Sequence, residues 1–231
     1  MLKDSGLVNT RFFLRYLKTP KSYVLLFPLL GIVSFVVLYI IAALLYPGGS
    51  VAYPQQNGFN FWNNYLCDLL DEFALNGELN TARFYARYAL TMLCTSLLLL
   101  WFYLPKLFAK TTLNQHIMWV SGLLSLLVVF FLAAQIHDEI VRIAGVFGVI
   151  AFISSSIELY KAGYTKLCML GFSCLFIFLV NYYIYETGMY IRSLPVIQKV
   201  TFVFCIIWFL SLNLEVYKKL KMTSSKDLQN R

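Results

Sequence analysis

The stretch SYVLLFPLLGIVSFVVLYIIAALLY, Ser22 to Tyr46, contains no charged residue and decides the fold class. As one helix it is long enough to cross the roughly 30 Å hydrocarbon core of a bilayer. It is too long for the apolar region of a normal signal peptide, and no small-x-small cleavage site follows it. We therefore expect a retained membrane span.

The composition of the whole chain extends this prediction beyond the first span. Of 231 residues, 60% are hydrophobic and only 13% are charged, whereas a soluble domain carries about 25% charged residues. So few charges cannot cover a globular surface, and the excess apolar side chains must face lipid. Five further apolar runs lie at about 85–104, 115–135, 140–160, 167–186 and 195–217. The fold class is therefore all-α, a polytopic membrane bundle of six transmembrane helices.

The domain organisation is one membrane domain over 22–217, between a basic segment 1–21 and a basic tail 218–231. The connections alternate between basic and non-basic, and the first one, 47–84, is acidic. Because lysine and arginine gather on the cytoplasmic side, both termini are expected to be cytoplasmic and the 47–84 loop to lie outside. The net charge of +8 follows from this bias. The basic residues form no aromatic-rich patch, so we expect no nucleic-acid partner.

The outer loop contains an apolar/polar alternation in FWNNYLCDLLDEF, Phe61 to Phe73. Its repeat is close to 3.6 residues and predicts an amphipathic helix over about 60–76, begun by Asn60 and stopped by Gly77. Asn80 or Thr81 would then cap the second span. Three interpretations stay open: an interfacial helix with a solvated acidic face, a lid over a cavity, and a disordered loop.

Polar residues of the spans concentrate in the outer half, close to this loop. Ionisable groups at membrane depth usually pair or line a water-filled cavity. We therefore expect Arg87 to pair with Asp68 or Asp138, and Glu186 with Lys199. The predicted pocket residues are Asn64, Asp68, Asp71, Glu72, Arg87, His137, Arg142, Asn181, Glu186 and Lys199.

A short motif resembles a known family. Tyr46-Pro47-Gly48-Gly49, the run Asn64-Tyr65-Leu66-Cys67-Asp68-Leu69, Gly77 and Asn80 are similar to the bacterial six-span membrane family catalogued as domain of unknown function 998, distantly like the Frag1/DRAM/Sfk1 group. The family more often has serine at the position of Cys67, which argues against an essential hydroxyl nucleophile there. The resemblance implies the six-span fold and a bacterial cytoplasmic (inner) membrane location, and it brings no reaction with it.

Three functions compete at this point. The first is a binding or accessory protein whose outer pocket holds a lipid headgroup or a partner membrane protein. The second is an outward-facing enzyme on a lipid-linked substrate, with His137, Asp138 and Asp68 as acid-base or metal-binding groups, or Cys67 as nucleophile. The third, a carrier, lacks midplane charges and repeated halves. No catalytic motif occurs. Two histidines and five cysteines without a CxxC pair predict no structural metal site and no cofactor.

Overall fold

The computed structural model describes residues 20–131 and 137–229, with side chains for 20–131 and 138–223. Six long helices follow one another: α2 (Leu26–Leu45), α3 (Arg83–Tyr103), α4 (Leu113–Val129), α5 (His137–Lys161), α6 (Thr165–Thr187) and α7 (Leu194–Gln229). Short 3-10 helices are η1 (Ser22–Leu25), η2 (Cys67–Leu70), η3 (Leu104–Leu107) and η4 (Ile191–Ser193). The described residues contain no β-strand, so the all-α prediction is confirmed for them.

The architecture is that of a multi-pass membrane bundle. Five helices are long and apolar enough to cross a membrane, and α4 is a shorter apolar helix of 17 residues. The face of α2 that no other helix covers carries exposed Phe27, Leu30, Val37 and Leu44. In water these side chains would be costly, and in a bilayer they contact lipid.

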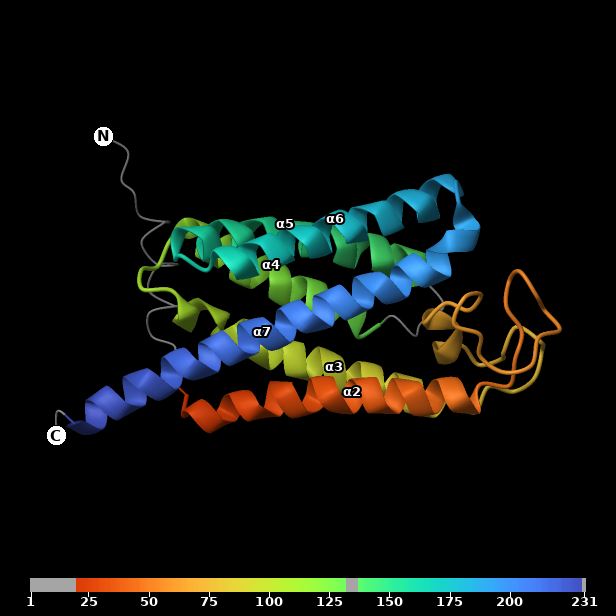
Figure 1. The fold of residues 1–231 in the computed structure, drawn as a ribbon, viewed down its shortest axis with the longest axis horizontal. Helices are drawn as coiled ribbons and strands as arrows, with labels where there is room; N and C mark the ends of the chain where they lie inside the picture. Colours follow the sequence, from red (N-terminus) through yellow and green to blue (C-terminus); the bar gives the residue numbers. More distant parts are fainter. Residues whose placement is uncertain (1–19, 132–136, 230–231) are drawn as a thin grey trace.

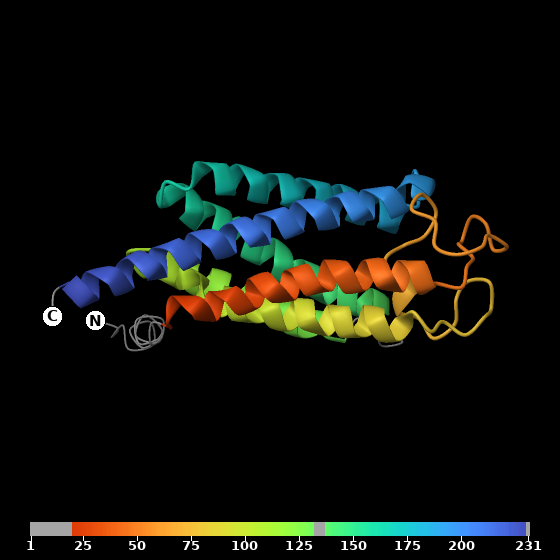
Figure 2. The ribbon, with the colours of Figure 1, turned by 60° about the horizontal axis from the view of Figure 1, so that its bottom comes forward.

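The helices run up and down in two groups joined by α7. Figure 1 shows α2 and α3 side by side, α4, α5 and α6 in a second group, and α7 crossing between the groups at a slant. In the second view α2 and α3 again lie next to each other and α6 lies apart from them, while the first part of α5 passes behind the pair (Figure 2). The start of α2 and the end of α7 lie at one end, which we name the tail end, and the α2–α3 connection lies at the other.

Tryptophan side chains fasten neighbouring helices to one another in the core. Trp208 is fully buried and stacks on Phe152 with ring centroids 4.5 Å apart. Its Nε1–H donates to the Leu167 carbonyl of α6, and Trp101 Nε1–H donates to the Met118 carbonyl of α4, both at 3.0 Å. A Cβ at Gly122 would lie 2.0 Å from the Trp101 indole, so glycine is required for this contact between α3 and α4.

One of the predicted elements is wrong. The segment 60–76 forms turns and the four-residue η2 in place of an amphipathic helix. The reason is local: side-chain oxygens of Asn60, Asn64 and Asp68 accept backbone N–H groups at Trp62, Asn60 and Tyr65, which gives the backbone an alternative to helical bonds.

The last helix extends beyond the predicted span. Helix α7 contains the span of about 195–217 and continues through the basic tail to Gln229. No proline or glycine follows Pro195 within it, and Lys218 and Glu215 pair one turn apart at 2.7 Å, so nothing in this segment stops the helix.

Candidate functional site

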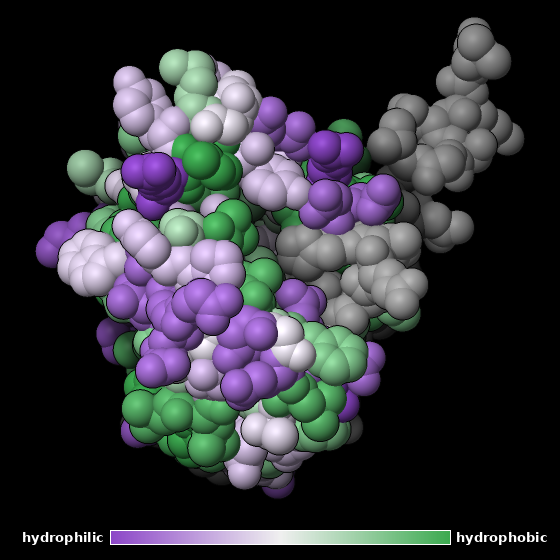
Figure 3. Space-filling model, turned by 90° about the vertical axis from the view of Figure 1, so that its right-hand side faces the viewer, coloured by the Kyte–Doolittle hydropathy of each residue, from purple (hydrophilic) through white to green (hydrophobic). Residues whose placement is uncertain are grey.

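Residues 47–82 fold into a compact structure over the end of the bundle opposite the tail end, and we name it the cap. Seen end-on (Figure 3), hydrophilic side chains cover the middle of this face, and hydrophobic side chains lie along its lower rim. Cap residues Leu69, Leu70, Ala74 and Ala82 are buried against Ala42 of α2 and Ala86 of α3. The cap is therefore a packed part of the bundle.

Helix α7 holds the cap through two adjacent polar residues. The Lys199 ammonium donates to the Asn64 carbonyl at 2.5 Å and to the Pro195 carbonyl at 2.9 Å, and the side chain is only 7% exposed. It also lies over the rings of Phe59 and Phe61, 5.5 and 5.1 Å from their centroids, a cation–π arrangement. Next to it, Gln198 Oε1 accepts the Leu66 N–H at 2.7 Å.

The Asn64 side chain joins four parts of the cap. Its amide donates to the Gly49 carbonyl at 2.7 Å and to Asp68 Oδ2 at 2.9 Å. Its Oδ1 accepts from Gln56 Nε2 at 2.6 Å and from the Asn60 N–H at 2.9 Å. A primary amide has two donors and two acceptor lone pairs, so this fully buried group has no bonding capacity left for a ligand.

Asn80 fixes the cap on the α3 side. Its amide donates to the carbonyls of Asp68, Leu69 and Asp71 at 3.0–3.3 Å, and its Oδ1 accepts the Ala82 N–H at 3.1 Å. Asn80 is thus a loop anchor; helix α3 begins three residues later, after Ala82, which makes no side-chain capping bond. From α3 itself, Arg87 Nε donates to the Leu70 carbonyl at 2.9 Å.

The glycines after α2 permit the tight turn into the cap. Gly49 has φ +83°, and a Cβ there would lie 2.3 Å from the Asn76 backbone nitrogen. Gly77 has φ +88° but open space around it. The positive φ expected at Gly77 is present, although it closes a turn next to the Phe73–Leu79 bridge rather than ending a helix.

Burial raises the pKa of the two candidate catalytic groups in the cap. Burial, followed by the nearby Asp68 carboxylate, raises the pKa of the Cys67 thiol to about 12. Because the thiolate is the nucleophile, Cys67 is unreactive in this environment. Burial also raises the pKa of Asp68, against hydrogen bonds from Asn64 and the Tyr65 N–H that favour its charged form. Asp68 accepts these bonds as a structural group.

The predicted ion pairs form with other partners. Glu186 pairs with Arg142 at 2.9 Å rather than with Lys199, since both lie on the facing helices α5 and α6. Arg87 bonds the Leu70 carbonyl rather than Asp68, because Asp68 is already turned toward Asn64. The Tyr185 hydroxyl bonds Asp138.

The remaining predicted pocket residues lie at separate places. Asn181 of α6 bonds Thr201 of α7 at 3.4 Å, and Glu72 pairs with Arg83 at 3.5 Å on the cap surface. The backbone carbonyl of Asp71 accepts a hydrogen bond from the Asn80 amide. The side chain of His137 lies outside the described residues. The structure therefore gathers Asn64, Asp68 and Lys199, and it distributes the others over the rest of the cap end.

The described part of the chain contains no set of side chains suited to bind a metal ion. No three histidine, cysteine, aspartate or glutamate side chains come close enough there to hold an ion.

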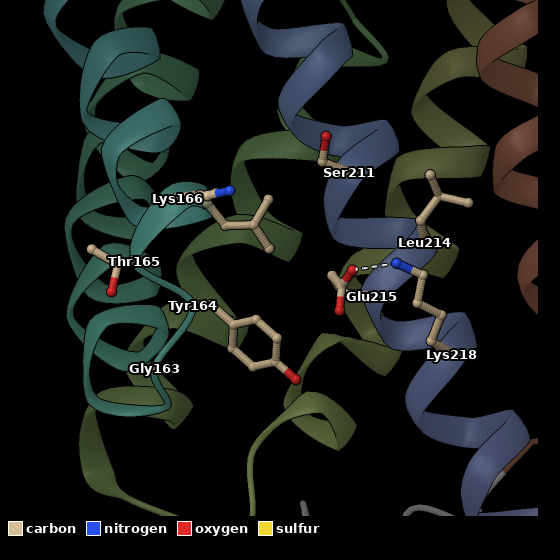
Figure 4. A pocket seen from close by; sticks show the side chains of 9 residues that line it. Gly163, Tyr164, Thr165, Lys166, Ser211, Leu214, Glu215 and Lys218 are labelled. Atoms are coloured by element: carbon tan, nitrogen blue, oxygen red, sulfur yellow. Dashed lines mark hydrogen bonds and ion pairs between the residues drawn. The ribbon is translucent and has the colours of Figure 1, made fainter.

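Among the described residues, two hollows are large enough to hold a ligand. One lies on the cap, has a volume of about 600 Å³ and is lined by Tyr53, Pro54, Gln55, Gln56, Asn60 and Asn63; we name it the cap hollow. The other lies at the tail end between the start of α6 and the second half of α7 (Figure 4), with a volume of about 590 Å³. We name it the tail-end pocket. Sequence analysis missed both, although the uncharged run PQQN, Pro54 to Asn57, marks the first.

Comparison with known proteins finds no matching family model, no matching curated protein and no matching solved structure. The resemblance to the six-span family described above therefore stays a prediction. The function has to be argued from the contacts of this chain.

Proposed function

We propose that this chain is a binding or accessory protein of the membrane, whose cap lies on the outer side and holds a segment of a partner protein in the cap hollow. The observation that carries the proposal is the way the cap is fixed. Lys199 of α7 and Arg87 of α3 donate to cap carbonyls, and buried Asn64 and Asn80 bond the cap's own backbone. A preorganised surface loses little conformational entropy on binding.

The chemistry of the cap hollow suits a peptide. No charged residue lines it, and its amide side chains offer both donors and acceptors. Tyr53 and Trp62, exposed on the same cap, are residue types that dominate binding energy at protein interfaces. An uncharged lining gives no counter-charge for an anionic lipid headgroup, which makes that ligand the weaker candidate for this hollow.

The orientation is part of the proposal. Lys106, Lys110, Lys161 and Lys166 lie in the connections at the tail end, whereas the cap carries Asp68, Asp71, Glu72 and Glu78. This distribution supports a cytoplasmic tail end and an outer cap. It also supports cytoplasmic termini, and the bacterial inner membrane enters the proposal only through the family resemblance.

The contacts of Cys67 and Asp68 support a catalytic role of the cap less well than a binding role. Cys67 is held as a neutral thiol, and the Asp68 carboxylate is committed to the cap. Asp138 bonds the Tyr185 hydroxyl, whereas Asp68 bonds Asn64 and the Tyr65 N–H, so these two carboxylates of the predicted acid-base group have different partners.

Site-specific photocrosslinking in native membranes tests the proposal. A benzophenone side chain placed at Gln55, in the cap hollow, is expected to give a discrete protein adduct. The same side chain at Ile150, exposed on α5, should give lipid adducts only. Discrete protein adducts from Ile150 alone, or none from Gln55, would contradict the proposal. A lipid adduct from Gln55 would favour the lipid-headgroup alternative.

The sidedness is tested separately. A single cysteine at Gln55, with the five native cysteines replaced, should react with a membrane-impermeant maleimide in intact spheroplasts. A single cysteine at Lys221 should react only after permeabilisation. The reverse pattern would place the cap on the inner side.

A further inference from the structure

The tail-end pocket lies where two membrane helices separate. Tyr164 and Lys166, at the start of α6, point toward the side of α7 that carries Ser211 and Glu215 (Figure 4). Leu167 and Leu214 complete the lining with apolar surface. The pocket therefore has a polar side and an apolar side.

The lining carries a net positive charge. Lys218 is bound to Glu215 at 2.7 Å, so these two charges offset each other. Lys166 is exposed and makes no ion pair or hydrogen bond with any described residue. An ammonium group on a pocket wall that has no partner among the described residues is available for an anionic ligand.

Helix α6 adds to this potential. It begins at Thr165, and Tyr164 in the N-cap position provides no side-chain capping bond. The N–H groups of the first turn then lack intrahelical acceptors and carry partial positive charge at the same wall as Lys166. Lys166 and the first turn of α6 therefore attract an anionic ligand from the same wall of the pocket.

The surroundings indicate an amphiphilic ligand. One turn from the pocket, Met169 and Phe172 of α6 are exposed on the membrane-facing surface, and Leu214 of α7 is exposed at the pocket itself. A soluble anion would leave this apolar surface uncovered. A phospholipid covers it with acyl chains while its phosphate reaches the lysine.

We propose that the tail-end pocket binds an anionic phospholipid, with its phosphodiester at Lys166 and the first turn of α6 and its acyl chains along Met169, Phe172 and Leu214. The site lies at the opposite end from the cap and does not depend on the function proposed for the cap. Basic pockets between membrane helices on the cytoplasmic side suit such headgroups. Glu215 sets the limit on affinity, because it neutralises Lys218 and repels the phosphate.

Lipid titration of the detergent-solubilised full chain, read by native mass spectrometry, tests this proposal. We expect dioctanoyl phosphatidylglycerol to bind more tightly than dioctanoyl phosphatidylcholine. Lys166→Gln should weaken phosphatidylglycerol binding about fivefold, the effect of one lysine at a charged lipid surface. Lys221→Gln, an equal charge change on α7 outside the pocket, should leave it unchanged.

A variant of opposite sign sharpens the test. Glu215→Gln should tighten phosphatidylglycerol binding, because it frees Lys218 and removes the repulsion. Equal losses for Lys166→Gln and Lys221→Gln would overturn the proposal in favour of unspecific charge attraction. Equal binding of the two lipids would overturn it as well. Displacement of the lipid by millimolar inorganic phosphate, without a preference for the glycerol headgroup, would show a soluble-phosphate site instead.

Discussion

Two lysines at opposite ends of the molecule show how differently the same side chain is used. Lys199, at the cap end, is buried, donates to two backbone carbonyls and lies over two aromatic rings. Lys166, at the tail end, is exposed on a pocket wall and bonds no described residue. The first holds the fold together, and the second is available to a ligand.

The difference teaches that polar residues in an apolar chain do not mark a site by their presence alone. At the cap end, Asn64 and Asn80 use their amide groups on the cap's own backbone. Unsatisfied backbone groups of a non-helical loop near a membrane are costly, and these side chains satisfy them. The cap is therefore a structural unit, and binding falls to the groups it leaves open.

The largest effect is expected from the glycines of the cap. Both Gly49 and Gly77 have positive φ, so alanine at either costs about 1–2 kcal/mol of backbone strain. At Gly49 the new Cβ also meets backbone atoms of Asn76 and Leu75, and such overpacking adds about 1–3 kcal/mol. Gly49→Ala should therefore lower the opening free energy of the cap, read by hydrogen exchange in nanodiscs, well beyond Gly77→Ala. Equal effects would mean that the turn is not packed as described.

The next largest effect is expected at Asn80. Asn80→Ala leaves the Ala82 N–H and the carbonyl of Asp71 without their partner, and unsatisfied groups of this kind cost roughly 1–3 kcal/mol each. Limited proteolysis within 47–82 should become at least tenfold faster. Asn57→Ala is the matched control, because the Asn57 side chain is exposed in the same loop. A similar rate for both variants would contradict the anchoring role of Asn80.

The two lysines provide the direct contrast. Lys199→Met removes charged hydrogen bonds worth about 2 kcal/mol, so opening of the cap and maleimide labelling of Cys67 should accelerate about 30-fold. The measurement uses a chain in which the other four cysteines are replaced. Lys166→Met should leave the labelling rate unchanged. If it accelerates labelling as much as Lys199→Met, the contrast between the two ends fails.

The smallest effect concerns pH. Burial raises the pKa of Asp68 above its usual 3.8, so the folded cap binds this proton more tightly than the unfolded cap does. The contribution of Asp68 to stability is then fully present below pH 3.8 and declines as the pH rises through the raised pKa. Thermal unfolding from pH 3.5 to 7.5 should show the wild type losing stability relative to Asp68→Asn with rising pH. A relative gain would contradict the sign of the shift.

The membrane helices could be predicted from the sequence because each one is encoded by a continuous apolar run. Long uncharged runs such as Ser22 to Tyr46 have few alternatives in a membrane, and all six predicted spans correspond to helices of the structure. The motif residues Asn64 and Asp68, which the sequence analysis singled out, bond each other inside the cap.

The cap could not be predicted from periodicity. The alternation from Phe61 to Phe73 fits a helix, but Asn60, Asn64 and Asp68 bond the backbone in ways that no pattern of apolar residues encodes. The partners of Glu186 and Arg87 depended on which helix faces were neighbours. Lys166 and Glu215 lie far apart in sequence. They line the same pocket because α6 and α7 leave a space between them there.

Hydrogen–deuterium exchange of the wild-type protein in lipid nanodiscs tests the central account most directly. If buried polar side chains fix the cap, amides of Tyr65, Leu66 and Asn80, which donate to Asp68, Gln198 and Glu72, will exchange at least a hundredfold more slowly than an unstructured peptide. The exposed tip around Gln55 will exchange fast and serve as the internal reference. Fast exchange at all of these amides would show a mobile loop, and the cap would then be no preformed binding surface.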